Sequence, residues 1–162
     1  MNKADTLTII FQHNLWANLR LFEKCGKLTT EQLDSSIVGV FGSIRDTLFH
    51  IVRAERGYLS RISTGKRYIP PEDDNIMTIA EMITAIRTTG EGFIGWAPKI
   101  QADDTVEIEW DGTLRQMPKT IILNQVINHA TEHRSQVMSI MTQIGVEPPD
   151  VSSWSYFGEL EM

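Results

Sequence analysis

The chain has 162 residues, of which 41% are hydrophobic and 22% are charged, a composition typical of one soluble globular domain, expected here over residues 1–162. No apolar run approaches the roughly 18–20 residues that a membrane span requires, so a membrane protein is excluded. With 21 acidic against 15 basic residues the net charge is −6, which disfavours a role in binding nucleic acid because the chain would repel phosphates on average.

The first part of the chain predicts two long helices with a short turn between them. Apolar residues at helical spacing favour a helix over residues 5–25, which the side chain of Asp5 can cap. A short helical turn is expected over residues 29–32. The second long helix is predicted from Ser43, where a capping box begins, to Gly65, which can adopt the left-handed conformation that ends a helix.

A third helix is predicted from Thr78, where another capping box begins. Its second half contains Gly90, Gly92 and Gly95. Each glycine weakens a helix by about 1 kcal/mol relative to alanine, so we expect a bend or early fraying there.

A hairpin and a fourth helix complete the predicted fold. Residues 105–110 alternate between apolar and polar, and the Asp111-Gly112 pair that follows is typical of a tight turn before a returning strand over 113–117. The fourth helix is predicted over residues 118–145. The tail over 151–162 carries three aromatic residues and is expected to pack back on the helices. The sequence therefore predicts an all-α protein, a four-helix bundle with a small β-hairpin between its third and fourth helices.

Cys25 is the only cysteine, so no intrachain disulfide can form, which fits a cytoplasmic location. A lone cysteine is more often a small buried residue than a reactive thiol, and we expect a buried one here.

The histidines are the residues that most strongly suggest chemistry. His129 and His133 are four residues apart, so both project from one face of the fourth helix, among apolar side chains. A buried imidazole needs partners for its nitrogens, and a shared metal ion would satisfy one nitrogen of each ring. His50, in an apolar run of the second helix, is the candidate third ligand. The alternative, a network of hydrogen bonds without a metal, stays open.

Three segments of the chain together resemble the DinB family. They are FQHNLWANLRL over residues 11–21, HIVRAE over 50–55 and NHATEHRSQ over 128–136. The last resembles that family's signature Asn-His-x-x-x-His-Arg-x-Gln. The resemblance implies a four-helix bundle with a crossover connection, often found as a homodimer. It also implies a divalent metal ion, zinc or nickel among others, held by three histidines that correspond to His50, His129 and His133.

Further residues of these segments are candidates for the surroundings of the metal. Asn14, Glu55, Arg134 and Gln136 could orient its ligands, and Arg134 could pair with Glu55 or bind an anionic group of a substrate. A role in holding the bundle together is the alternative for each of them. His13 stands where the family often has tyrosine, and it could line a pocket.

The resemblance also implies a class of reactions on a small-molecule substrate. Characterised relatives include transferases and isomerases that use a low-molecular-weight thiol such as bacillithiol. A metal-dependent S-transferase is therefore the leading hypothesis, although no individual catalytic residue is predicted beyond the metal ligands. A metal-dependent hydrolase that activates water, or a stress protein that binds a metal or ligand without turnover, is the alternative.

Overall fold

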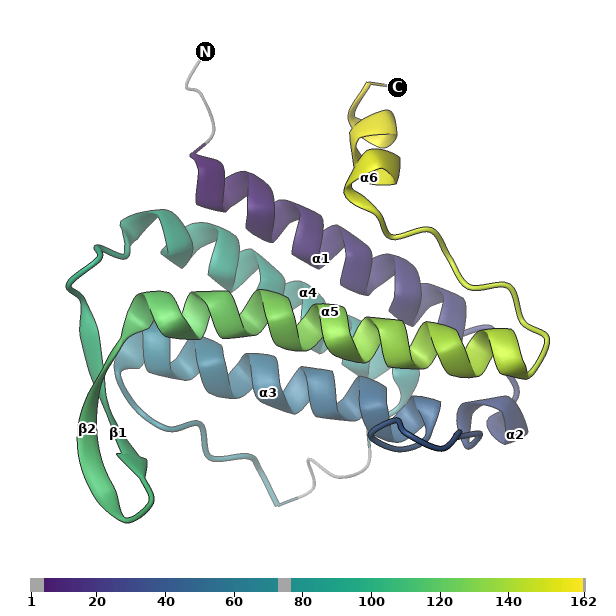
Figure 1. The fold of residues 1–162 in the computed structure, drawn as a ribbon, viewed down its shortest axis with the longest axis horizontal. Coiled ribbons are helices and arrows are strands. Elements are labelled where there is room, and N and C mark those ends of the chain that lie inside the picture. Colours follow the sequence, from purple (N-terminus) through teal and green to yellow (C-terminus); the bar gives the residue numbers. More distant parts are fainter. Residues whose placement is uncertain (1–4, 73–76, 162) are drawn as a thin grey trace.

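The structure, a computed structural model, describes residues 5–72 and 77–161. Four long helices form a bundle, as predicted, and a two-stranded antiparallel hairpin lies at one end of it (Figure 1). The elements in chain order are α1 (Thr6–Cys25), α2 (Thr30–Leu33), α3 (Ile44–Thr64), α4 (Ile79–Trp96), a 3₁₀ turn (Ala97–Lys99), β1 (Thr105–Trp110), β2 (Thr113–Pro118), α5 (Lys119–Gln143) and α6 (Ser153–Leu160). No helix among the described residues is long and apolar enough to cross a membrane.

The starts of three long helices follow from side chains that bond to the first free backbone N–H groups. The Asp5 carboxylate accepts from the N–H of Leu7 at the start of α1. Ser43 begins α3 and Thr78 begins α4, each through a reciprocal capping box with the acidic residue three positions later. These predicted starts are therefore confirmed to within one residue.

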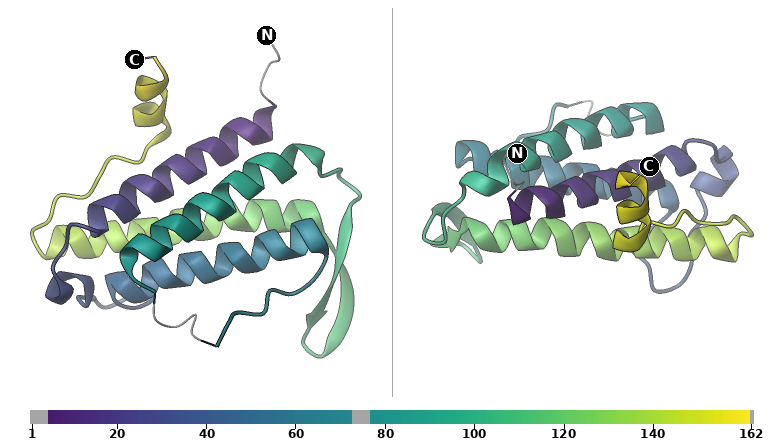
Figure 2. Two further views of the ribbon diagram at one scale, coloured as in Figure 1. Left: turned by 180° about the vertical axis from the view of Figure 1, so that it is seen from behind. Right: turned by 90° about the horizontal axis from the view of Figure 1, so that it is seen from above.

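The helices are arranged so that α3 and α5 lie side by side. α3 packs on both α4 and α5, while α1 packs mainly on α4. α3 and α4 run in the same direction, so the chain travels back along the bundle between them (Figures 1 and 2). This is the crossover connection that the resemblance implies, and it leaves α3 and α5 as neighbours.

The core has two apolar clusters with a polar layer between them. One cluster contains Leu21, Leu48, Ile86 and Ile140, and the other contains residues nearer the hairpin, including Phe11, Phe93, Ile122 and Val126. Each long helix contributes buried polar residues that fall between the positions that supply the two clusters; they include Asn14, Asn18, Glu55, Thr89 and Arg134.

The expectation that α4 would fray early at its glycines is wrong, because α4 continues unbroken to Trp96. The glycines serve close packing instead. A Cβ atom at Gly90 would overlap the Leu15 side chain of α1, and one at Gly92 would lie 2.6 Å from Cδ2 of Leu59 on α3. The helix backbone of α4 thus approaches its neighbours at distances that a larger residue would not permit.

The hairpin forms with the predicted turn. Asp111 and Gly112 both have positive φ, 52° and 71°, and Trp110 pairs with Thr113 across the turn. This is the conformation that favours an Asp-Gly pair in a two-residue hairpin loop.

The tail packs on α1, as expected. One of its three aromatic rings and one glutamate make the contacts. Tyr156 lies against Trp16, with ring centroids 5.2 Å apart, and Glu159 accepts from Trp16 Nε1 at 2.8 Å and pairs with Arg20 at 2.7 Å. The side chains of Trp154 and Phe157 point away and are 85% and 54% exposed. Met162 lies outside the described residues.

Candidate metal centre

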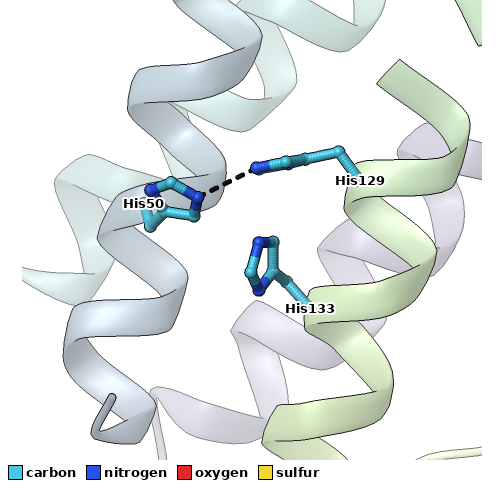
Figure 3. A group of neighbouring side chains, drawn as sticks. All are labelled: His50, His129 and His133. Atoms are coloured by element: carbon cyan, nitrogen blue, oxygen red, sulfur yellow. Dashed lines mark hydrogen bonds between the residues drawn. The ribbon is translucent and has the colours of Figure 1, made fainter. Parts of the chain in front are cut away.

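The structure brings the three predicted histidines together between α3 and α5. His50 projects from α3 toward His129 and His133, which lie one turn apart on α5 (Figure 3). One nitrogen of each ring lies within 4.8 Å of the others, and Nε2 of His129 is 2.9 Å from Nε2 of His50. Two nitrogens that share one ion at about 2.0–2.1 Å would themselves be about 2.9–3.4 Å apart, so the separation of His50 and His129 fits a shared ion.

Burial favours the neutral form of His50 and His129, which is the form that binds a metal ion. Burial, and to a smaller extent the nearby His133 and His50, together lower the pKa of His129 from 6.5 to about 4. The pKa of His50 is also lowered, first by burial and then by His133 and Arg53. Near neutral pH a cation would therefore displace no proton from either ring.

Gln136 orients His133 from the next turn of α5. Its side-chain oxygen lies 2.9 Å from Nδ1 of His133 and also accepts from the backbone N–H of Phe41 at 3.2 Å. Because an amide oxygen only accepts, Nδ1 of His133 carries the proton and Nε2 keeps its lone pair. Gln136 thus holds the ring in the tautomer that a metal ligand needs.

Two aromatic side chains flank the histidines. Phe41, in the loop before α3, stacks on His50 with centroids 4.1 Å apart and meets His133 edge-on at 5.5 Å. Tyr58 of α3 meets His129 edge-on at 5.9 Å. Sequence reasoning missed both residues. Tyr58 lies two turns after His50 on α3, a spacing that could have indicated it, whereas nothing in the loop pattern marks Phe41.

The other predicted surroundings of the metal form a separate buried network. The Glu55 carboxylate accepts from Asn18 at 2.8 Å and from Asn14 at 3.4 Å through Oε1, and from the Thr89 hydroxyl at 2.6 Å through Oε2. Within residues 5–72 and 77–161, no side-chain hydrogen bond joins this network to one of the three histidines. Asn18 and Thr89 were not predicted as members.

Arg134 reaches Glu55 only through the two asparagines. Its Nη1 donates to Oδ1 of Asn14 at 2.8 Å and of Asn18 at 2.7 Å, and their amide groups in turn donate to Glu55. Burial lowers the pKa of Arg134 and Glu55 raises it by a smaller amount, so that the pKa falls from 12.5 to about 10. Burial also raises the pKa of Glu55, against the lowering effects of Thr89, Arg134 and the asparagines. The network connects α1, α3, α4 and α5 at their middles.

His13 and Cys25 lie away from the three histidines. His13 is 3.1 Å from the Val151 carbonyl oxygen through Nε2, and with Arg134 it lines a hollow of about 490 Å³ next to the C-terminal segment. Cys25 is fully buried, which raises the pKa of its thiol to about 12. It is therefore the buried residue expected from the sequence and no reactive thiol.

The comparisons with known proteins agree with this fold. The sequence model described as "DinB family" matches residues 1–158. Protein DinB of Bacillus subtilis (strain 168) is 24% identical over 152 residues, which cover 88% of each chain.

Two crystal structures of DinB-like proteins resemble the present one. The protein from Bacillus cereus ATCC 10987 has a TM-score of 0.63 at 24% identity, over 87% of this chain and 92% of the other. The protein from Bacillus subtilis has a TM-score of 0.64 at 13% identity, over 91% and 99%. These structures support the fold, and the match to the family over almost the whole length decides membership. The chain belongs to the DinB family.

Proposed function

We propose that the chain is a metal-dependent S-transferase that joins a low-molecular-weight thiol, such as bacillithiol, to an electrophilic small molecule. The observation that carries the proposal is the convergence of His50, His129 and His133 within 4.8 Å. Three neutral nitrogen ligands from two neighbouring helices suit zinc or nickel and leave a coordination position for a further ligand.

A divalent ion held there would supply one property, a lowered pKa for a coordinated thiol. The chain itself supplies the neutral imidazoles and, through Gln136, the tautomer of His133. Phe41 covers His50 with an apolar ring, which excludes water from that side. In the transfer, the thiol sulfur forms a bond to the electrophilic carbon, the thiol proton passes to solvent, and the leaving group departs with its electron pair.

Two alternatives remain for the same site. A hydrolase would use the open position for water instead of a thiol. A stress protein that binds a metal or ligand without turnover would need no substrate beside it. We favour the enzyme because a structural ion is usually enclosed by four protein ligands, whereas three converge here among the residues that the structure describes. We also propose that the chain acts in the cytoplasm and forms a homodimer. Light scattering of the purified protein would test the dimer through its molar mass.

The decisive experiment is the cobalt-substituted protein, whose absorption spectrum reports its ligands. Adding bacillithiol, glutathione or cysteine should produce a thiolate-to-cobalt charge-transfer band, and the protein should then conjugate the thiol to a model electrophile such as 1-chloro-2,4-dinitrobenzene with release of chloride. His129→Ala should lose both the bound cobalt and the conjugation.

Cys25→Ser is the matched control, because Cys25 is buried and cannot supply the thiol. It should conjugate at the wild-type rate. Conjugation that is equal in wild type and His129→Ala would overturn the role of the metal. A cobalt-loaded protein that gives no band and no conjugation with any thiol would overturn the transferase and favour a hydrolase or a binding protein.

A further inference from the structure

A cavity of about 500 Å³ lies between α3, α5 and the hairpin. It begins one turn of α5 from the candidate metal centre, because Gln125 lines it and precedes His129 by four residues. Tyr58 also lines it, and the same ring touches His129. Figure 1 shows the hairpin beside the ends of α3 and α5 that enclose this space. The cavity thus lies next to the three histidines, and Tyr58 contacts both.

The walls of the cavity are mainly apolar. Ile108 and Trp110 of β1 and Met117 of β2 face Ile122 of α5 across it. The Trp110 side chain is 54% exposed although it is one of the largest apolar side chains of the hairpin. An aromatic or aliphatic group bound in the cavity would cover these side chains, which favours binding through the hydrophobic effect.

Arg61 adds a positive charge to these walls. It lines the cavity together with Tyr58, and both also line an adjoining hollow of about 260 Å³ that contains Arg53 and Arg67. The guanidinium of Arg61 donates to the Gly57 carbonyl oxygen at 3.3 Å through Nη1, which leaves its other N–H donors for a ligand. Among the described residues no carboxylate lies within ion-pair distance of Arg61; Glu109 is the one carboxylate that lines the cavity.

We propose that this cavity binds the electrophilic substrate, and that the substrate has an aromatic or aliphatic body with a carboxylate or sulfonate group. The body packs against Trp110 and Met117, the anionic group pairs with Arg61, and the reactive carbon lies toward His129. The assignment to the substrate rests on the proposed function, whereas the chemistry of the ligand rests on the cavity alone.

The test compares two probes that share their aromatic rings and differ in charge. 1-Anilinonaphthalene-8-sulfonate carries a sulfonate, and N-phenyl-1-naphthylamine lacks it; both fluoresce when they enter an apolar site. For the zinc-loaded protein, Arg61→Met should weaken binding of the sulfonate about tenfold and of the neutral probe less than about twofold. Trp110→Ala should weaken both. Arg87→Met, an exposed change on α4, should alter neither.

Location is tested by replacing zinc with cobalt, which quenches nearby fluorescence. The bound sulfonate probe should be quenched in wild type and unquenched in His129→Ala. Equal affinities of wild type and Arg61→Met for the sulfonate, in variants with an unchanged melting temperature, would overturn the anion contact. A lack of quenching in the cobalt-loaded protein would overturn the placement of the bound probe beside the candidate metal centre. These assays use no thiol and no turnover. A failure to detect thiol conjugation would therefore leave the ligand chemistry of the cavity intact, and a failure of the probe assays would leave the proposed transferase activity intact.

Discussion

At the scale of single residues, one glutamine fixes the orientation of His133, a candidate metal ligand. Gln136 accepts a hydrogen bond from His133 and another from the backbone of Phe41, so it links the ring to the loop that covers the centre. The family signature includes this glutamine, and the structure supplies the reason. A carbonyl oxygen at this place selects the tautomer with its lone pair on Nε2.

The Gln136→Ala variant should therefore bind zinc about 10–100-fold more weakly, because His133 loses the partner that fixes its orientation. Competition with a chromophoric chelator would measure the affinity. Gln143→Ala, two turns later on α5 and exposed, is the matched control and should bind like wild type. An unchanged affinity in Gln136→Ala would contradict the role of this hydrogen bond.

The lowered pKa of His129 predicts how the metal-free protein responds to acid. In the unfolded chain the ring takes up a proton near pH 6.5, whereas in the folded chain it does so near pH 4. The unfolded state thus binds more protons between these values, so stability is complete above pH 6.5 and falls as the pH drops toward 4. Melting curves with chelator present should show this fall, and His129→Gln should reduce it. A melting temperature that is constant across the window would contradict the burial of a neutral ring.

At the scale of elements, the glycines of α4 show that helix propensity alone wrongly predicts early fraying of this helix. Gly90 meets Leu15 of α1 so closely that no Cβ fits, whereas Gly95 has no neighbour within 4 Å. Gly90→Ala should destabilise the protein by about 1–3 kcal/mol through overpacking, despite the better helix propensity of alanine. Gly95→Ala should stabilise it by up to about 1 kcal/mol. Urea unfolding of both variants would measure the difference, and a stabilised Gly90→Ala would contradict the close packing.

The helix starts, the hairpin turn and the His129–His133 pair could be predicted because each depends on residues close in sequence or on one helical face. His50 lies on another helix and is identified from its apolar run and from the family resemblance. Ser43, Thr78 and the Asp111-Gly112 pair act within a few residues of their position. The contact of Phe41 with His50 and Gln136 could not be predicted, since it depends on how a loop folds over two helices. The side chains of His133 and Arg134 leave α5 about 100° apart, as helix geometry requires. Which of them meets His50 and which meets the asparagines of α1 depends on tertiary packing.

At the scale of the whole molecule, the Glu55 network connects all four long helices between the two apolar clusters. Glu55→Ala should cost about 3–5 kcal/mol, because it leaves two asparagine amides and the Thr89 hydroxyl buried without their acceptor and removes the negative charge nearest Arg134. Glu55→Gln should cost less, since its amide oxygen can still accept. The exposed Glu23→Ala should change the free energy of unfolding by less than about 0.5 kcal/mol. Equal losses in Glu55→Ala and Glu23→Ala would show that the network is not stabilising.

The last prediction concerns removal of the metal. The two apolar clusters and the Glu55 network involve none of the three histidines, so the bundle should fold without an ion, unlike a zinc finger. An ion that binds only the folded state, present at about 1,000 times its dissociation constant, adds about 4 kcal/mol to the free energy of unfolding. For a chain of this size that corresponds to a melting temperature about 8–16 °C higher.

Chelation should therefore lower the melting temperature by that amount and leave the helical circular dichroism at 25 °C nearly unchanged. His133→Ala should melt at the lower temperature with or without zinc. A single cooperative transition in both states would support one domain over residues 1–162, because the polar layer couples the two clusters. Loss of most helical signal on chelation would mean that the ion is needed for folding, and the centre would then be structural, with no position kept open for a thiol.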